Sequence, residues 1–156
     1  MTINKSEKVS IFVYGTLKPG EDNYIPYCKD RYSQVFNAKV KGEIYDLPMG
    51  YPAMVESDEW ARGVLYEFTD ISVLYDIDSL EGYDPSLSED QNLYKRKMVE
   101  VFGENKKFLC FAWAYYMNKE RVIRLGGHKV NDGCWHSKTR FQPDCHHELI
   151  KKLRAI

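Results

Sequence analysis

The chain has 156 residues and a formal net charge of -1, with 22 Lys and Arg side chains against 23 Asp and Glu. Hydrophobic residues make up 44% and charged residues 29%, a balance typical of a globular domain that excludes an intrinsically disordered or collagen-like chain. The nearly neutral charge also argues against a nucleic-acid-binding protein, which normally carries a basic excess.

The length predicts one domain over residues 1–156. No run approaches the ~20 apolar residues of a membrane-spanning helix, and the apolar run at residues 9–14 is too short for a signal peptide. Four cysteines are scattered along the chain without a Cys-x-x-Cys pair: Cys28, Cys110, Cys134 and Cys145. We expect free thiols in a reducing compartment, and therefore a soluble cytoplasmic protein without a membrane partner.

The first half of the sequence predicts short strands that are separated by turns rich in glycine and proline. A glycine-containing loop over 15–20 and one or two helical turns over 23–30 follow the first strand. The strands expected in this half cover residues 9–14, 35–45, 51–55 and 60–68.

The period then changes to that of a helix, which Thr69 or Asp70 can cap and which Gly82 can end. A polar loop over 84–92 precedes a hairpin of strands 94–102 and 107–117, and a last short helix is expected over 146–153. Many short strands with one amphipathic helix predict the α+β class, as a small mixed or antiparallel β-barrel with flanking helices.

Glu81 is the first candidate for chemistry because it falls on the apolar stripe of the predicted helix, four residues after Ile77. Asp76 and Asp78 fall to either side of that stripe, where we expect them in solvent. Burial and the helix dipole would raise the pKa of an inward-facing carboxyl in the last turn, so that it exchanges protons near neutral pH. The periodicity leaves a second interpretation open, in which Glu81 lies at the rim and pairs with a Lys or Arg.

The segment Tyr14-Gly15-Thr16-Leu17 is the second candidate because it turns the chain at the end of the first predicted strand. A glycine here lets successive backbone N–H groups point into a cavity, where they can bind a carboxylate or a developing oxyanion. The alternative is a plain turn without a ligand, since strands commonly end at glycine.

A group of Cys and His side chains near the C-terminus invites a metal-site interpretation: Cys134, His136, Cys145, His146 and His147. Their spacing matches no familiar tetrahedral zinc site, and we expect no bound metal. Neither cysteine has a recognisable base partner, and no Gly-x-Ser-x-Gly motif or phosphate-binding loop is present. The sequence therefore shows no signature of a protein nucleophile.

Blocks of sequence in a fixed order resemble the γ-glutamylcyclotransferase-like family. They are IFVYGTLKPG at 11–20, GEIYDL at 42–47, GYPA at 50–53, GVLY at 63–66, DSLEGY at 78–83, Tyr94-x-Arg96, AWAYY at 112–116 and GCW at 133–135. In the last block, Cys134 stands where the family has Asp. The resemblance covers a core over about residues 9–136 and leaves residues 137–156 as a C-terminal extension.

The resemblance implies a compact β-barrel with a cavity at one end and an acyl-transfer or lyase-type enzyme that needs no cofactor. Its small-molecule substrate would be a γ-glutamyl amide, which is cyclised to 5-oxoproline with release of the amine. Tyr14, Gly15, Thr16 and Leu17 would bind the substrate, and Glu81 would be the acid and base.

Other interpretations stay open from the sequence. The chain could be a noncatalytic module of the same fold that binds a small carboxylate. Either Tyr115 or Tyr116 lines the cavity, because neighbouring residues of a strand point to opposite faces. Arg96 is expected to pair with Asp78 in a structural role. The sequence leaves the amine half of the substrate and the oligomeric state undetermined.

Overall fold

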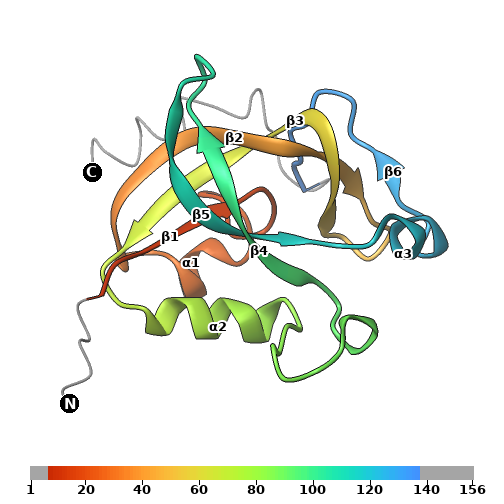
Figure 1. Ribbon diagram of the computed structural model, residues 1–156, viewed down its shortest axis with the longest axis horizontal. Coiled ribbons are helices and arrows are strands. Elements are labelled where there is room, and N and C mark those ends of the chain that lie inside the picture. The colour runs from red at the N-terminus through yellow and green to blue at the C-terminus, as the bar shows by residue number, and fades with distance from the viewer. Residues whose placement is uncertain (1–6, 138–156) are drawn as a thin grey trace.

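The computed structural model describes residues 7–137 of the chain (Figure 1). The strands are β1 (Val9–Val13), β2 (Tyr32–Asp46), β3 (Pro52–Phe68), β4 (Lys95–Phe102), β5 (Phe108–Tyr116) and β6 (His128–Lys129). The helices are α1 (Tyr24–Tyr27), α2 (Ser72–Leu80), α3 (Lys119–Arg124) and the 3-10 helix η1 (Glu89–Gln91). None of the helices in this part of the chain has the length and apolar character needed to cross a membrane.

The six strands form one curled sheet in the order β3-β1-β5-β4-β2-β6. An additional pairing of β2 with β3 joins the sheet back on itself, because these two strands form a long antiparallel hairpin. The β1–β5 pair is parallel and meets at Ile11 and Trp113, whereas the other pairs are antiparallel. The structure thus confirms the α+β class, with a mixed sheet that curls far enough for β3 at one end to pair with β2, the neighbour of β6 at the other.

Strand β1 is apolar except at Ser10, and both of its faces are buried. Ile11 and Val13 belong to a core cluster that includes the buried side chains of α2, which lies beneath the sheet in Figure 1. Phe12 belongs to a second cluster on the other face, together with residues such as Val40 and Leu65. Continuous hydrophobicity of a strand is the pattern expected when each face packs against other elements.

Helix α2 matches its prediction closely. Its buried side chains include Val73 and Ile77 at helical spacing, and Gly82 takes a positive φ of 63° just after the helix ends. Asp70 supplies an early hydrogen bond, since its Oδ1 accepts the Ser72 N–H at 2.9 Å, although Ile71 occupies the N-cap position.

Several predicted boundaries are wrong. The strands expected at 51–55 and 60–68 are one continuous strand, β3. Both of its halves pair with β2, and its polar residues 56–59 bulge out at the irregularity between Lys41 and Glu43. Helix α3 and strand β6 were missed, since six and two residues are too few to show a periodicity. The helix expected at 146–153 lies outside the described residues.

The expectation of free thiols holds for Cys28 and Cys110. It is wrong at Cys134, which is disulfide-bonded.

Gly63 allows β1 and β3 to approach closely just before the turn at residues 14–17. A Cβ on Gly63 would lie 2.1 Å from the Val13 carbonyl oxygen and 2.9 Å from the Phe12 ring. We predict that Gly63→Ala lowers the free energy of unfolding by about 1–3 kcal/mol, measured by urea denaturation. Gly103→Ala is the control, because its Cβ would contact only side-chain atoms and no backbone, with the Asn105 Oδ1 nearest at 3.2 Å. An equal loss in both variants would contradict the argument.

Candidate active site

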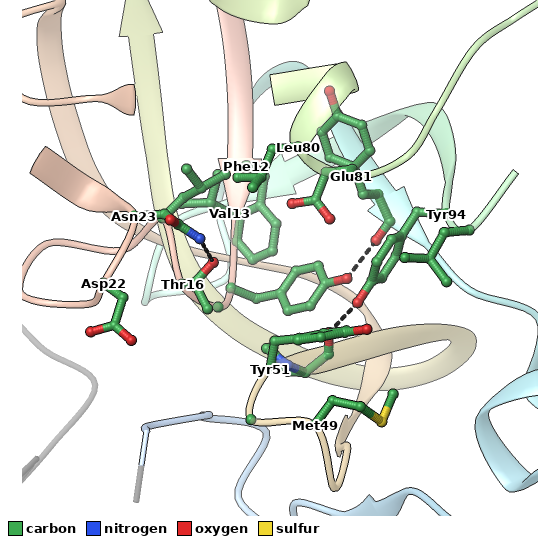
Figure 2. A pocket seen from close by; sticks show the side chains of 17 residues that line it. Phe12, Val13, Thr16, Asp22, Asn23, Met49, Tyr51, Leu80, Glu81 and Tyr94 are labelled. Carbon is green, nitrogen blue, oxygen red and sulfur yellow. Dashed lines mark hydrogen bonds between the residues drawn. The ribbon is translucent and has the colours of Figure 1, made fainter. Parts of the chain in front are cut away.

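A cavity of about 410 Å³ opens where the end of β1, the end of α2 and the start of β4 come together (Figure 2). Six separate stretches of the chain line it, from Phe12 to Tyr115. The lining consists of Phe12, Val13, Tyr14, Gly15, Thr16, Leu17, Asp22, Asn23, Met49, Gly50, Tyr51, Pro52, Leu80, Glu81, Leu93, Tyr94 and Tyr115.

The cavity brings together both sets of residues that the sequence singled out. Tyr14, Gly15, Thr16 and Leu17 line it, and so does Glu81 from the end of α2. In Figure 2 the Glu81 carboxylate extends into the cavity from the side opposite Tyr51 and Met49. No ion pair among residues 7–137 involves Glu81, so the alternative in which it pairs with a Lys or Arg at the rim is not what the structure shows.

Glu81 occupies the C-cap position of α2, where its backbone N–H donates to the Ile77 carbonyl at 2.9 Å. Its side chain is partly exposed to the open cavity, but its carboxyl is poorly solvated. Burial, followed by the negative charge of Asp78, raises the pKa of Glu81 to about 8. The carboxyl can therefore take up or release a proton near neutral pH.

The turn at residues 15–17 has all its carbonyl groups occupied by the protein. The Gly15 carbonyl accepts from the Lys18 N–H at 3.0 Å, and the Thr16 carbonyl accepts from the Asn23 N–H at 2.8 Å. The Leu17 carbonyl accepts from the Tyr66 hydroxyl at 2.9 Å. The hydrogen bonds found among residues 7–137 include none donated by the N–H groups of these three turn residues. The hydrogen-bonding groups of this turn that the described residues leave unused are therefore donors rather than acceptors.

Two neighbours hold this turn in place from distant parts of the chain. A Cβ on Gly15 would lie 2.5 Å from the Pro52 Cγ, so only glycine fits against the start of β3. The buried Lys18 ammonium donates to the Trp135 carbonyl, and the Trp135 indole N–H donates to the Asp46 carboxylate at 2.7 Å. The position of the turn thus depends on β2, β3 and the end of the described chain.

Tyrosine hydroxyls form much of the polar lining. The Tyr14 hydroxyl donates to the Tyr115 carbonyl at 2.8 Å, and the Tyr94 hydroxyl donates to the Pro52 carbonyl at 2.6 Å. Burial raises the pKa of Tyr14 and of Tyr94 well above the ordinary value, so both stay neutral around Glu81. Between the two candidates on β5, Tyr115 lines the cavity, whereas Tyr116 packs in the core cluster on the other face.

Asp78 is not in solvent, and that part of the prediction is wrong. Its side chain is buried. Two hydrogen bonds compensate for the lost hydration, since Oδ2 accepts from Arg96 Nη1 at 2.6 Å and Oδ1 accepts from the Tyr115 hydroxyl at 2.6 Å. The predicted pairing of Arg96 with Asp78 is confirmed. The helical period gives the angle of a side chain around the helix axis, but it carries no information about a partner on β4.

Asn23, Tyr51 and Tyr94 also line the cavity, although the sequence analysis did not assign them to the site. The signal was present, since all three lie inside or beside blocks that carry the family resemblance. Among residues 7–137, no group of three or more His, Cys, Asp or Glu side chains is arranged to hold a metal ion. Cys145, His146 and His147 lie outside the described residues.

Comparison with known proteins agrees with this fold. The family model described as "Gamma-glutamyl cyclotransferase, AIG2-like" matches residues 11–137. The chain is 31% identical over 114 residues to the γ-L-glutamyl-butirosin B γ-glutamyl cyclotransferase of Niallia circulans, covering 73% of this chain and 70% of that one.

Solved structures share the fold. An AIG2-like protein from Mus musculus superposes with a TM-score of 0.62 at 18% identity, covering 90% of this chain and 99% of that one. The protein ytfP from Escherichia coli gives a TM-score of 0.57 at 19% identity, covering 85% of this chain and 100% of that one. The chain belongs to the AIG2-like γ-glutamyl cyclotransferase family and is a cyclotransferase enzyme by that membership.

The raised pKa of Glu81 predicts how stability depends on pH. The pKa of about 8 in the folded protein lies above the ordinary value of 4.5, so the folded state holds a proton that the unfolded state has lost between these values. The free energy of unfolding should therefore fall as the pH rises from about 4.5 to 8. We predict that Glu81→Gln removes most of this fall and stabilises the protein at pH 9 by on the order of 2–4 kcal/mol, measured by urea denaturation.

The matched control is Asp76→Asn on the exposed side of the same helix, where Asp76 lies 3.0 Å from Arg31. This variant should keep the wild-type pH dependence. At pH 4 the Glu81→Gln variant and the wild type should have nearly equal stability, because both side chains are then neutral. If Glu81→Gln raised the free energy of unfolding as much at pH 4 as at pH 9, the gain would not come from a raised pKa of Glu81.

Proposed function

We propose that the protein cyclises a γ-glutamyl amide to 5-oxoproline and releases the amine, with Glu81 as the acid and base. The observation that carries this proposal is the position of the Glu81 carboxyl, which shares one cavity with the turn at residues 14–17. Family membership supports the reaction class, and the raised pKa of Glu81 suits a group that must both accept and donate a proton.

The nucleophile is the substrate's own α-amino nitrogen. It attacks the γ-carbonyl carbon and forms the C–N bond of the five-membered ring, while one of its protons passes to the Glu81 carboxylate. The resulting tetrahedral intermediate then breaks the bond to the amide nitrogen, which takes the proton from Glu81 and leaves as the amine. Protons and electron pairs balance without an oxidant or a protein nucleophile, and holding the substrate chain in its folded geometry contributes several kcal/mol to lowering the barrier, on the order of proximity effects elsewhere.

The turn at residues 15–17 supports this reaction through its backbone N–H groups. They either stabilise the oxyanion of the tetrahedral intermediate or bind the α-carboxylate of the substrate, since both ligands carry negative charge. The hydrogen bonds that the carbonyls of this turn accept within the protein fix the turn before substrate binds, so that little ordering is needed at the moment of reaction.

The amine half of the substrate would lie toward the open side of the cavity. Asp22 lines this cavity together with Glu81, and Figure 2 shows the two carboxylates on different sides of it. The negative charge of Asp22 disfavours a leaving group that carries its own carboxylate. We infer an amine half that is neutral or cationic, and the relative from Niallia circulans is named for the γ-glutamyl derivative of butirosin B.

Replacing the proposed acid and base tests the reaction directly. Glu81→Gln should fold normally and lower the rate of 5-oxoproline release by at least about 100-fold, because the neutral amide cannot accept the proton. Asp76→Asn should retain wild-type turnover. Turnover by Glu81→Gln at the wild-type rate would remove Glu81 from this role, and wild-type protein that binds 5-oxoproline without any turnover would indicate a noncatalytic binding module instead.

A pair of substrates of equal length tests the charge preference. We predict that γ-glutamyl-butylamine is cleaved with a kcat/KM roughly 10-fold or more above that of γ-glutamyl-4-aminobutyrate, which differs in bearing a terminal carboxylate. Asp22→Asn should narrow the ratio without abolishing turnover of the butylamine derivative. Equal kcat/KM values for both substrates would contradict the inferred amine half.

A further inference from the structure

A second carboxylate, with its own cation, lies next to Glu81 outside the cavity. Asp78 precedes Glu81 by one turn of α2, and its Oδ2 forms an ion pair with Arg96 Nη1 at 2.6 Å. Both side chains are largely buried. A buried ion pair contributes little net stability compared with apolar packing, so its retention here calls for another explanation.

Arg96 is held firmly in this position by aromatic rings. Its guanidinium lies 4.4 Å from the centre of the Trp113 ring and 5.2 Å from that of Tyr83. The guanidinium is thus stacked between a residue of β5 and a residue that follows α2, and its charge faces Asp78. Such stacking favours Arg over Lys, because the guanidinium is planar and weakly hydrated.

Tyr115 connects this pair to the cavity. Its hydroxyl donates to Asp78 Oδ1 at 2.6 Å, while its backbone carbonyl accepts the Tyr14 hydroxyl at 2.8 Å. Tyr115 and Tyr14 both line the cavity that Glu81 enters. Tyr115 alone therefore separates the ion pair from the cavity, since it lines the cavity and contacts Asp78.

We propose that Asp78 and Arg96 are positioning residues that set the pH at which Glu81 exchanges its proton, with opposite effects. The inference rests on the proposed function of Glu81. The negative charge of Asp78 makes the Glu81 anion less favourable, and the positive charge of Arg96 limits that effect by neutralising Asp78. Asp78 and Glu81 are three residues apart, about one helical turn, and two charges this close interact strongly where little water surrounds them.

The other titratable groups around Glu81 do not compete with this effect. Tyr14 from β1, Tyr94 before β4 and Tyr115 on β5 face the same region, and burial raises the pKa of each so that they stay neutral. Asp22 lies on another side of the cavity. Asp78 is the charge that contributes to the raised pKa of Glu81, which agrees with the geometry.

The test is the pH dependence of kcat/KM for 5-oxoproline release in a matched set of variants. We call the pH at which kcat/KM reaches half of its maximum the half-maximal pH. Asp78→Asn should lower it by about one unit, and Arg96→Gln should raise it by a similar amount. Arg96→Lys keeps the charge and should stay close to the wild type. Tyr115→Phe removes a hydrogen bond to Asp78 without changing any charge and should leave the half-maximal pH in place, whatever it does to the rate.

A purely structural ion pair would lower the rate in all variants without moving the profiles in opposite directions. Profiles of Asp78→Asn and Arg96→Gln that shift the same way, or that coincide with the wild type, would overturn the proposal. Should Asp78→Asn fail to fold, Arg96→Gln and Arg96→Lys decide alone, since a rise with Gln that Lys reverses supports the proposal and its absence refutes it.

A direct titration separates this proposal from the proposed function. The Glu81 carboxyl carbon can be followed by NMR in protein labelled with ¹³C-glutamate, with its signal assigned by its loss in Glu81→Gln. The same opposite shifts are expected in the titration midpoint. If the wild type releases no 5-oxoproline, the proposed function fails, yet the titration still shows whether Asp78 and Arg96 control Glu81.

Discussion

The whole site depends on a carboxyl that is held where water solvates it poorly. Glu81 reaches the cavity because α2 docks on the sheet through Val73, Leu74 and Ile77, which fixes the direction in which its last turn points. The packing of the helix thereby keeps an acid in surroundings that disfavour its charge. The same packing contacts that stabilise the fold give this side chain its proton affinity.

The two faces of the curled sheet pack against different parts of the protein. One core cluster joins the sheet to α2 and includes Tyr115, while the other fills the opposite face and includes Tyr116. Neighbouring residues of β5 therefore serve different ends: one connects the cavity to the buried ion pair, and the other donates its hydroxyl to the Lys41 carbonyl of β2. Because the sheet is rigid, the polar groups around the cavity are already in place before a ligand arrives.

The sequence predicted the features that depend on residues close to one another along the chain. The stripe of α2, its end at Gly82 and the β4–β5 hairpin were readable because each depends on residues close in the sequence. The pairing of Asp78 with Arg96 was predicted, but the burial of Asp78 was not, since it depends on where β4 and β5 place Arg96 and Tyr115 relative to α2. Likewise the family resemblance pointed to Glu81 and the turn at 14–17, but the contributions of Tyr51 and Tyr94 to one cavity follow only from the curvature of the sheet.

The hydrogen bond from Lys18 to the Trp135 carbonyl, which anchors the turn at residues 14–17, affects when the site forms during biosynthesis. This turn leaves the ribosome well before Trp135, whose carbonyl accepts the hydrogen bond from Lys18 beside the turn. A nascent chain can complete the β2–β3 hairpin long before that contact exists. The binding turn thus gains its last anchor after most of the domain has been synthesised, and a partly translated chain carries every proposed catalytic group without a finished site.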